Sequence, residues 1–150
     1  MYFHNGLFEE ALLDLQRCKE LNHGKDHRLI ALADFRINRE LGNEQAAFEG
    51  LKRWYGNILG AMETKEMDSI YQVSGIDGIL KRRIESTDNL SEKPSLYGIL
   101  GNDEKALEWL EIAVEKGEEH AEFPFLYEFR NLHSNPRFQT LLLKIGLGDQ

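Results

Sequence analysis

The sequence is poor in the two residues that crosslink or kink a chain. Its 150 residues include one cysteine, Cys18, and three prolines. A single cysteine cannot form an internal disulfide, so we expect a reducing compartment. So few prolines argue against a collagen-like or proline-rich disordered chain. A chain of this length can bury a hydrophobic interior without disulfides or metals.

Long apolar runs and targeting signals are also missing. No apolar stretch approaches the roughly 20 residues that a helix needs to cross a bilayer. The opening segment, residues 1–6, lacks the charged and apolar regions of a signal peptide. We therefore expect a cytoplasmic protein with no membrane partner.

Positive charge is in deficit. The chain has 18 lysine and arginine residues against 26 aspartate and glutamate residues, a formal net charge of -8. Binding to a nucleic-acid backbone needs clustered cations that neutralise phosphates. The one basic cluster, residues 81–83, lies beside Glu85 and Asp88 and is typical of a solvated helix face. We therefore expect no direct nucleic-acid binding.

What the sequence does have is a repeating spacing around four glycines. Gly6, Gly42, Gly75 and Gly101 are separated by 36, 33 and 26 residues. Three of them follow a tyrosine by four residues: Tyr2, Tyr71 and Tyr97. A small or aliphatic residue stands five places after each glycine, and an aliphatic residue four places after that: Ala11, Ala47, Leu80 and Ala106, then Leu15, Leu51, Ile84 and Leu110.

Each position in this pattern has a physical role in a helical hairpin. The aromatic residue packs across the inner face of a first helix, and glycine permits the backbone conformation that ends that helix. A small residue in the next helix lets the two helices approach closely, and the aliphatic residue lies one turn further along the same face. The pattern is clearest in residues 2–12 and 100–107. It resembles the tetratricopeptide repeat, whose period is about 34 residues.

The resemblance implies an all-α fold, a right-handed superhelix of three to four helical hairpins with a C-terminal capping helix. We expect helices at residues 7–21, 27–41, 44–59, 65–73, 76–87 and 103–116, with a short helix beginning near Pro94. The fourth and fifth would fuse if Gly75 did not break them. In the second helix the apolar spacing predicts four buried residues: Ile30, Ala33, Ile37 and Leu41.

The end of the chain predicts a cap for the last repeat. Asn135 can cap a final helix, and Pro136 suits its first position. One stripe of that helix is apolar, and aromatic residues would lie beneath it: Phe138, Leu141, Leu142 and Ile145, above Phe123, Phe125, Tyr127 and Phe129. Residues 66–147 are also similar to the C-terminal repeat region of bacterial multidomain signalling proteins, which carry adenylate-cyclase-like, kinase or winged-helix domains.

We expect one domain over residues 1–150, with repeats to about residue 121 and the cap over residues 122–147. Tyr2 falls where the first helix of a hairpin should end, so the helix at 7–21 lacks its partner. Stacked repeats need their end faces covered. We therefore expect a fragment of a longer polypeptide, and coverage by a second chain is the alternative.

No residue pattern predicts catalysis, a metal or a cofactor. His23 and His27 have a metal-binding spacing, but Gly24 interrupts it. His120 lies among glutamates with no nucleophile marked nearby, and Cys18 occupies a position that the repeat buries. The large aromatic residues at helical spacing are interpreted as core: Trp54, Tyr55 and Trp109. We expect no enzyme activity, no metal site and no cofactor.

The resemblance implies a module that binds a protein or peptide in a groove lined by the first helix of each hairpin. Here those helices are residues 28–39 and 64–73, with four candidate contacts: Arg28, Phe35, Arg36 and Arg39. Arginine can grip a carboxylate through two parallel hydrogen bonds, so an acidic peptide or a chain terminus is the expected ligand class. The simpler alternative is that these arginines pair with acids nearby in sequence: Glu40, Glu44 or Asp34.

Two other functions stay open. The resemblance of the tail implies a regulatory or oligomerisation domain of a bacterial signalling protein, with no chemistry of its own and with homo-oligomers as a partner class. An enzyme built on acidic and histidine side chains would need those side chains to converge in one cleft.

Overall fold

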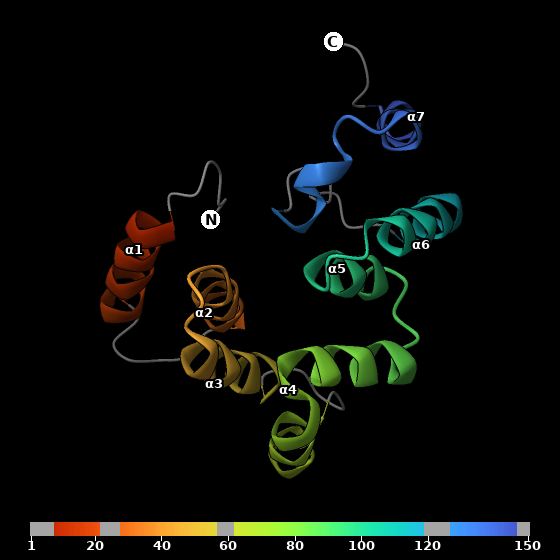
Figure 1. Cartoon of the computed structure of the whole chain (residues 1–150). Helices are drawn as coiled ribbons and strands as arrows, with labels where there is room; N and C mark the ends of the chain where they lie inside the picture. The colour runs from red at the N-terminus through yellow and green to blue at the C-terminus, as the bar shows by residue number, and fades with distance from the viewer. Residues whose placement is uncertain (1–7, 22–27, 57–61, 119–126, 147–150) are drawn as a thin grey trace. The chain divides into compact units, whose positions relative to one another are not determined.

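The computed structural model describes residues 8–21, 28–56, 62–118 and 127–146, and within these ranges the chain is helical with no strand. The elements are, in order, α1 (Phe8–Leu21), α2 (Arg28–Glu40), α3 (Glu44–Gly56), α4 (Thr64–Ser86), α5 (Glu92–Ile99), α6 (Asp103–Lys116), the 3-10 helix η2 (Tyr127–Leu132) and α7 (Pro136–Lys144). Figure 1 shows them coloured along the chain. The all-α class is thus confirmed for the described residues, and a right-handed superhelix stays a prediction.

The predicted helices agree with the observed ones to within a few residues. α6 has the predicted bounds, and α1 is described from Phe8, within the range predicted for the first helix. α5 is a short helix of 8 residues that begins two residues before Pro94. The helix expected over residues 44–59 is α3, and its expected last turn lies outside the described residues. None of the helices within the described ranges is both long enough and apolar enough to span a bilayer.

Three of the four repeat glycines adopt the backbone conformation for which the pattern needs glycine. Gly42, Gly75 and Gly101 have φ angles of 79°, 70° and 82°. Residues with a Cβ are strained in this left-handed region, whereas glycine is not. At Gly75 the conformation interrupts α4, so one non-helical residue separates two helical segments. Gly6 lies outside the described residues.

The chain divides into two compact units, one reaching Ile79 (unit 1) and one beginning at Leu80 (unit 2). The boundary falls inside α4, after the break at Gly75. The expectation of a single repeat domain over residues 1–150 stays a prediction.

Unit 1 is built on the hairpin of α2 and α3, against which α1 packs. The hairpin closes at Gly50, where an added Cβ would lie 2.7 Å from the backbone nitrogen of Phe35. Only glycine allows so close an approach of the two backbones. The fully buried residues of this interior are Leu15, Ala31, Phe35, Ile37, Ala47, Leu51, Tyr55, Met67 and Ile79.

The predicted register of α2 is only partly right. Ile30 and Ile37 are buried, but Ala33 and Leu41 are only half-buried. The remaining buried positions on this helix were not expected to be core: Ala31, Asp34, Phe35 and Asn38. α2 packs against both α1 and α3, so its buried surface is wider than the single stripe that apolar spacing indicates.

The core of unit 2 joins α6, η2 and α7. Its buried residues are Ala106, Leu107, Leu110, Phe129, Leu132, Phe138 and Leu141, with Leu142 and Ile145 packed against them. The predicted apolar stripe of the last helix is therefore confirmed. Asn135 caps α7, since its side chain accepts a hydrogen bond from the Arg137 backbone, and Pro136 opens the helix. Phe123 and Phe125 lie outside the described residues, as does the side chain of Tyr127.

α6 begins and ends at the capping residues that its sequence contains, Asn102 and Gly117. The Asn102 side chain accepts from the backbone nitrogen of Lys105 at 3.2 Å, a typical N-cap. At the other end Gly117 is left-handed, and the Glu118 nitrogen donates back to the Ala113 carbonyl at 2.9 Å. This satisfies carbonyls that a helix end would otherwise leave without a donor.

Candidate functional site

The C-terminal half of α2 presents two arginines on one side of the helix. Arg36 and Arg39 are three residues apart, a spacing that makes side chains neighbours on a helix surface. Both are half-buried. Arg28 is the first residue of α2, and its side chain lies outside the described part of the chain. Two of the four predicted contacts therefore share one surface.

Phe35 does not belong to that surface, and its prediction as a ligand contact is wrong for this structure. Its side chain is 0% exposed, and its ring stacks on Trp54 with the two centroids 6.4 Å apart. Gly50 closes over its backbone from α3. A side chain enclosed in this way contributes apolar burial to the hairpin and cannot meet a ligand.

Arg39 is held by a carboxylate far away in the sequence. Its Nη2 donates to Oδ1 of Asp77 at 2.7 Å. The arginine side chain is 26% exposed and the aspartate side chain 55% exposed, so solvent reaches this pair. Pairing of Arg39 with Glu40, Glu44 or Asp34 was the simple alternative, and Asp77 takes that role instead. An ion pair this open to water contributes only about 0–1 kcal/mol.

Asp34, by contrast, is the centre of a buried polar cluster. One carboxylate oxygen, Oδ2, accepts from Lys19 Nζ of α1 at 2.9 Å and from Arg53 Nη2 of α3. The other oxygen accepts from Asn38 Nδ2 at 2.8 Å. Asn38 in turn accepts from the side chain of Asn43. The cluster joins α1, α2 and α3, and hydrogen bonding to charged groups is what makes burial of the carboxylate tolerable.

The first segment of α4, the second helix predicted to line the groove, is attached to α3 by aromatic and ionic contacts. Tyr71 stacks on Phe48 with centroids 3.9 Å apart, and the Lys52 ammonium lies 4.6 Å from the Phe48 ring centroid. Lys52 also pairs with Glu49 at 3.1 Å and with Asp68 at 3.4 Å. Hydrogen bonding to Glu49 raises the pKa of Lys52, and burial opposes this effect.

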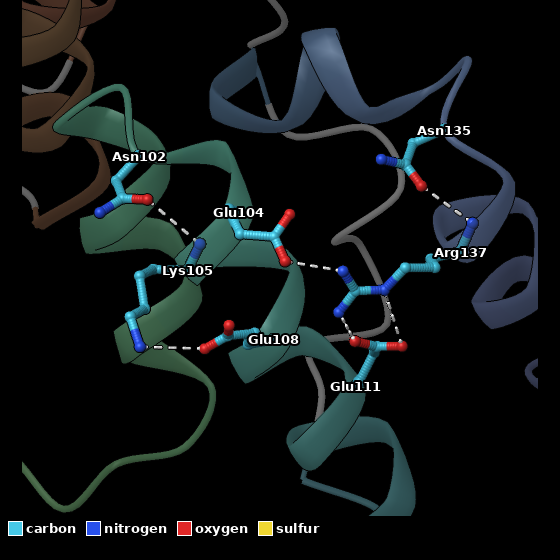
Figure 2. A network of polar contacts seen from close by, with 7 residues as sticks. All are labelled: Asn102, Glu104, Lys105, Glu108, Glu111, Asn135 and Arg137. Carbon is cyan, nitrogen blue, oxygen red and sulfur yellow. Dashed lines mark hydrogen bonds and ion pairs between the residues drawn. The ribbon is translucent and has the colours of Figure 1, made fainter.

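In unit 2 a polar network fixes α7 to α6, as Figure 2 shows. Arg137 Nη1 donates to Glu104 at 2.8 Å, and its other guanidinium nitrogens donate to Glu111. These bonds, first that to Glu111 and then that to Glu104, raise the pKa of Arg137. Lys105 donates to Glu108 at 3.1 Å, which raises the pKa of Lys105. The Arg137 bonds fasten α7 to α6.

A second ion pair of unit 2 is largely buried. Arg83 donates from Nε at 2.6 Å and from Nη2 at 2.9 Å to the two oxygens of Glu92, and Thr87 donates to the same carboxylate. This bidentate geometry is the strongest that arginine offers. It ties the end of α4 to the start of α5, so we assign it to the fold.

The aromatic residues interpreted as core divide into two groups. Trp54 and Tyr55 are buried and stack with centroids 4.8 Å apart. Trp109 is only half-buried, and the Lys93 ammonium lies 4.4 Å from its ring centroid. The core interpretation is confirmed for the first two residues.

Among the described residues, no three histidine, cysteine, aspartate or glutamate side chains are grouped in a way that could hold a metal ion. His23, His27 and His120 lie outside these residues, as does His4. His133 lies beside Phe138, with ring centroids 5.2 Å apart. Cys18, expected to be buried, is half-buried and has no disulfide partner.

Sequence reasoning missed Asp77 and the pairing of Asp34. Asp77 stands two residues after the turn glycine Gly75, so its place near a hairpin end could have been inferred. Asp34 lies between two apolar residues of α2, and a charge inside such a run is a signal of a buried ion pair.

Comparison of the chain with protein-family models, with curated proteins and with solved structures gave no match.

Proposed function

We propose that this chain is a non-catalytic module that binds a carboxylate-bearing segment of a partner protein at the Arg36–Arg39 surface of α2. The observation that carries the proposal is the Arg39–Asp77 pair. The guanidinium of Arg39 is reachable by solvent, and its present partner is weakly held because both groups are hydrated. A partner's carboxylate can therefore replace Asp77 at small cost.

Arginine suits this task better than lysine would. Its planar fork carries five donors and fits a carboxylate with two parallel hydrogen bonds. Arg36, one turn away on the same surface, adds a second cation to the approach path of an acidic ligand. The ligand class that follows is an acidic peptide or the carboxyl terminus of a chain.

We also propose that the hairpins belong to the tetratricopeptide class. Support comes from the left-handed glycines at the hairpin turns and from the buried small residues that follow them, Ala47 and Ala106. A crystal structure of the whole chain tests this proposal. Helices that close into a bundle around one centre would contradict it.

The binding proposal is tested by fluorescence anisotropy with a labelled six-residue peptide that alternates glutamate and leucine and ends in a free carboxylate. We expect Arg39→Gln to weaken binding about tenfold or more, since a hydrogen bond to a charged group contributes roughly 1.5–3 kcal/mol. Arg17→Gln is the matched control, because Arg17 is an exposed arginine on α1 that pairs with Asp14. Equal affinity of the wild type and Arg39→Gln would rule out this surface.

A further inference from the structure

We propose that Asp77 is an internal competitor that sets the ligand specificity of Arg39. The inference rests on the proposed function of the Arg39 surface. Asp77 occupies the position of the ligand's carboxylate, and a ligand binds only by displacing it. A ligand carboxylate that accepts two hydrogen bonds from the guanidinium displaces Asp77 well, and a weaker acceptor does not.

The geometry of the pair favours this exchange. The hydrogen bond between the two side chains runs from Nη2 of Arg39 to Oδ1 of Asp77 at 2.7 Å. It uses one donor of a group that has five, so the two-armed contact that arginine prefers is not made with Asp77. A ligand carboxylate that makes two parallel bonds gains one hydrogen bond over the internal partner. An amide or hydroxyl acceptor gains nothing and loses the attraction between opposite charges.

The backbone holds Asp77 in place. It lies two residues after Gly75, whose left-handed φ of 70° breaks α4 and starts the segment that carries the aspartate. Glu44 of α3 approaches the same break, since its Oε1 lies 3.6 Å from the place of a Cβ added at Gly75. Glu40, exposed on the last turn of α2, is the other acid near Arg39 in sequence. The Glu44 carboxylate raises the cost of approach for any anion, so we expect only an anion that makes two hydrogen bonds with Arg39 to compete well.

The experiment compares Asp77→Asn with Asp68→Asn in the full-length chain. Asp68 is a matched control because it lies on the same helix, is 48% exposed and pairs with Lys52. Both substitutions remove one negative charge, so a general electrostatic gain is the same in both. The probes are the glutamate–leucine peptide with a free carboxyl terminus, the same peptide with a terminal amide, and the peptide with glutamine in place of glutamate.

We expect Asp77→Asn to bind the free-carboxylate peptide about two- to fivefold more tightly than the wild type, which corresponds to the release of one exposed ion pair. Asp68→Asn should stay within the error of the wild type. The gain should vanish in an Arg39→Gln background, which a merely structural role of Asp77 would not predict. If only the terminal amide abolishes the gain, the ligand carboxylate is a chain terminus; if only the glutamine peptide does, it is a side chain.

Failure of this inference differs from failure of the proposed function. If wild type and Asp77→Asn bind the peptide equally well, Asp77 is not a competitor and the Arg39 surface still binds. If neither variant binds any of the three peptides, the proposed function itself is wrong. Thermal unfolding of each variant confirms that the exposed substitution leaves the fold intact.

Discussion

The two units of the chain hold their helices together in different ways. In unit 1 the junction of α1, α2 and α3 contains the buried carboxylate of Asp34 with its two cations. In unit 2 the buried cluster that joins α6, η2 and α7 consists of apolar side chains, and the exposed ion pairs of Arg137 lie outside it. The α1–α2–α3 junction is thus packed around a buried charge, whereas the α6–η2–α7 junction is packed around apolar side chains with Arg137 at its rim.

The difference indicates which substitutions should destabilise each junction. Apolar burial contributes stability in proportion to area and tolerates the loss of any rim charge. A buried ion cluster contributes little net stability, but removal of one member leaves the others desolvated. We therefore expect the α1–α2–α3 junction to be sensitive to the loss of a charge, and the α6–η2–α7 junction to be sensitive to the loss of an apolar side chain.

The largest expected effect is in the unit 2 core. Phe138→Ala should reduce the free energy of unfolding by about 3–5 kcal/mol, because the ring is fully buried and its loss leaves a cavity. Urea denaturation measures the loss, and hydrogen exchange localises it to α6 and α7. Leu143→Ala, an exposed position on the same helix, is the control and should change stability by no more than about 0.5 kcal/mol.

The next effect is in the ion cluster of unit 1. Asp34→Asn should reduce the free energy of unfolding by about 2–3 kcal/mol. This loss is smaller than that expected for a fully buried pair, because the side chains of Lys19 and Arg53 are 29% and 38% exposed. The combined replacement Lys19→Met, Asp34→Leu and Arg53→Met should recover most of that loss, because it removes the desolvated charges together. A triple variant less stable than Asp34→Asn would show that the cluster itself is a net source of stability.

A third change tests the close helix approach in unit 1. Gly50→Ala should destabilise by about 1–3 kcal/mol, because the new Cβ meets the backbone of α2 and overpacks the hairpin. Gly56→Ala on the same helix has nothing within 4 Å of the added Cβ. It should be neutral or stabilising by up to about 1 kcal/mol from helix propensity. Equal effects of the two substitutions would mean that α2 and α3 can move apart without loss.

Turn and cap residues were the features that the sequence could predict. Gly42, Gly75 and Gly101 stand where φ must be positive, and a short local stretch decides that requirement. The same holds for Asn135 and Pro136, whose capping bonds lie within one helical turn. Turns and caps of this kind can be predicted from the sequence because they depend on residues within one helical turn and not on tertiary contacts.

Tertiary pairing was the part that the sequence could not predict. Phe35 looked like a groove residue because α2 was expected to bury one stripe, whereas it packs on both α1 and α3. Asp77 pairs with Arg39 across 38 residues, and no spacing rule reaches so far. Asp34 is buried only because Lys19 and Arg53 arrive from two other helices. For the candidate site, the sequence pointed to Arg36 and Arg39 but not to Asp77, the ion-pair partner of Arg39.

The smallest expected effect completes the comparison at the rim of unit 2. Arg137→Gln removes the clamp on Glu104 and Glu111, which are exposed, so global stability should hardly change. Because the pKa of Arg137 is raised, its contribution is present below the unfolded pKa of arginine and is lost only as pH rises through the higher folded value. No dependence from this group should therefore appear between pH 5 and about pH 9. Faster hydrogen exchange in α7 at low salt, absent at about 0.5 M salt, is the expected signature. A large, salt-independent loss of global stability on Arg137→Gln would mean that the α6–α7 contact, like the Asp34 cluster, depends on a charge that the solvent does not screen.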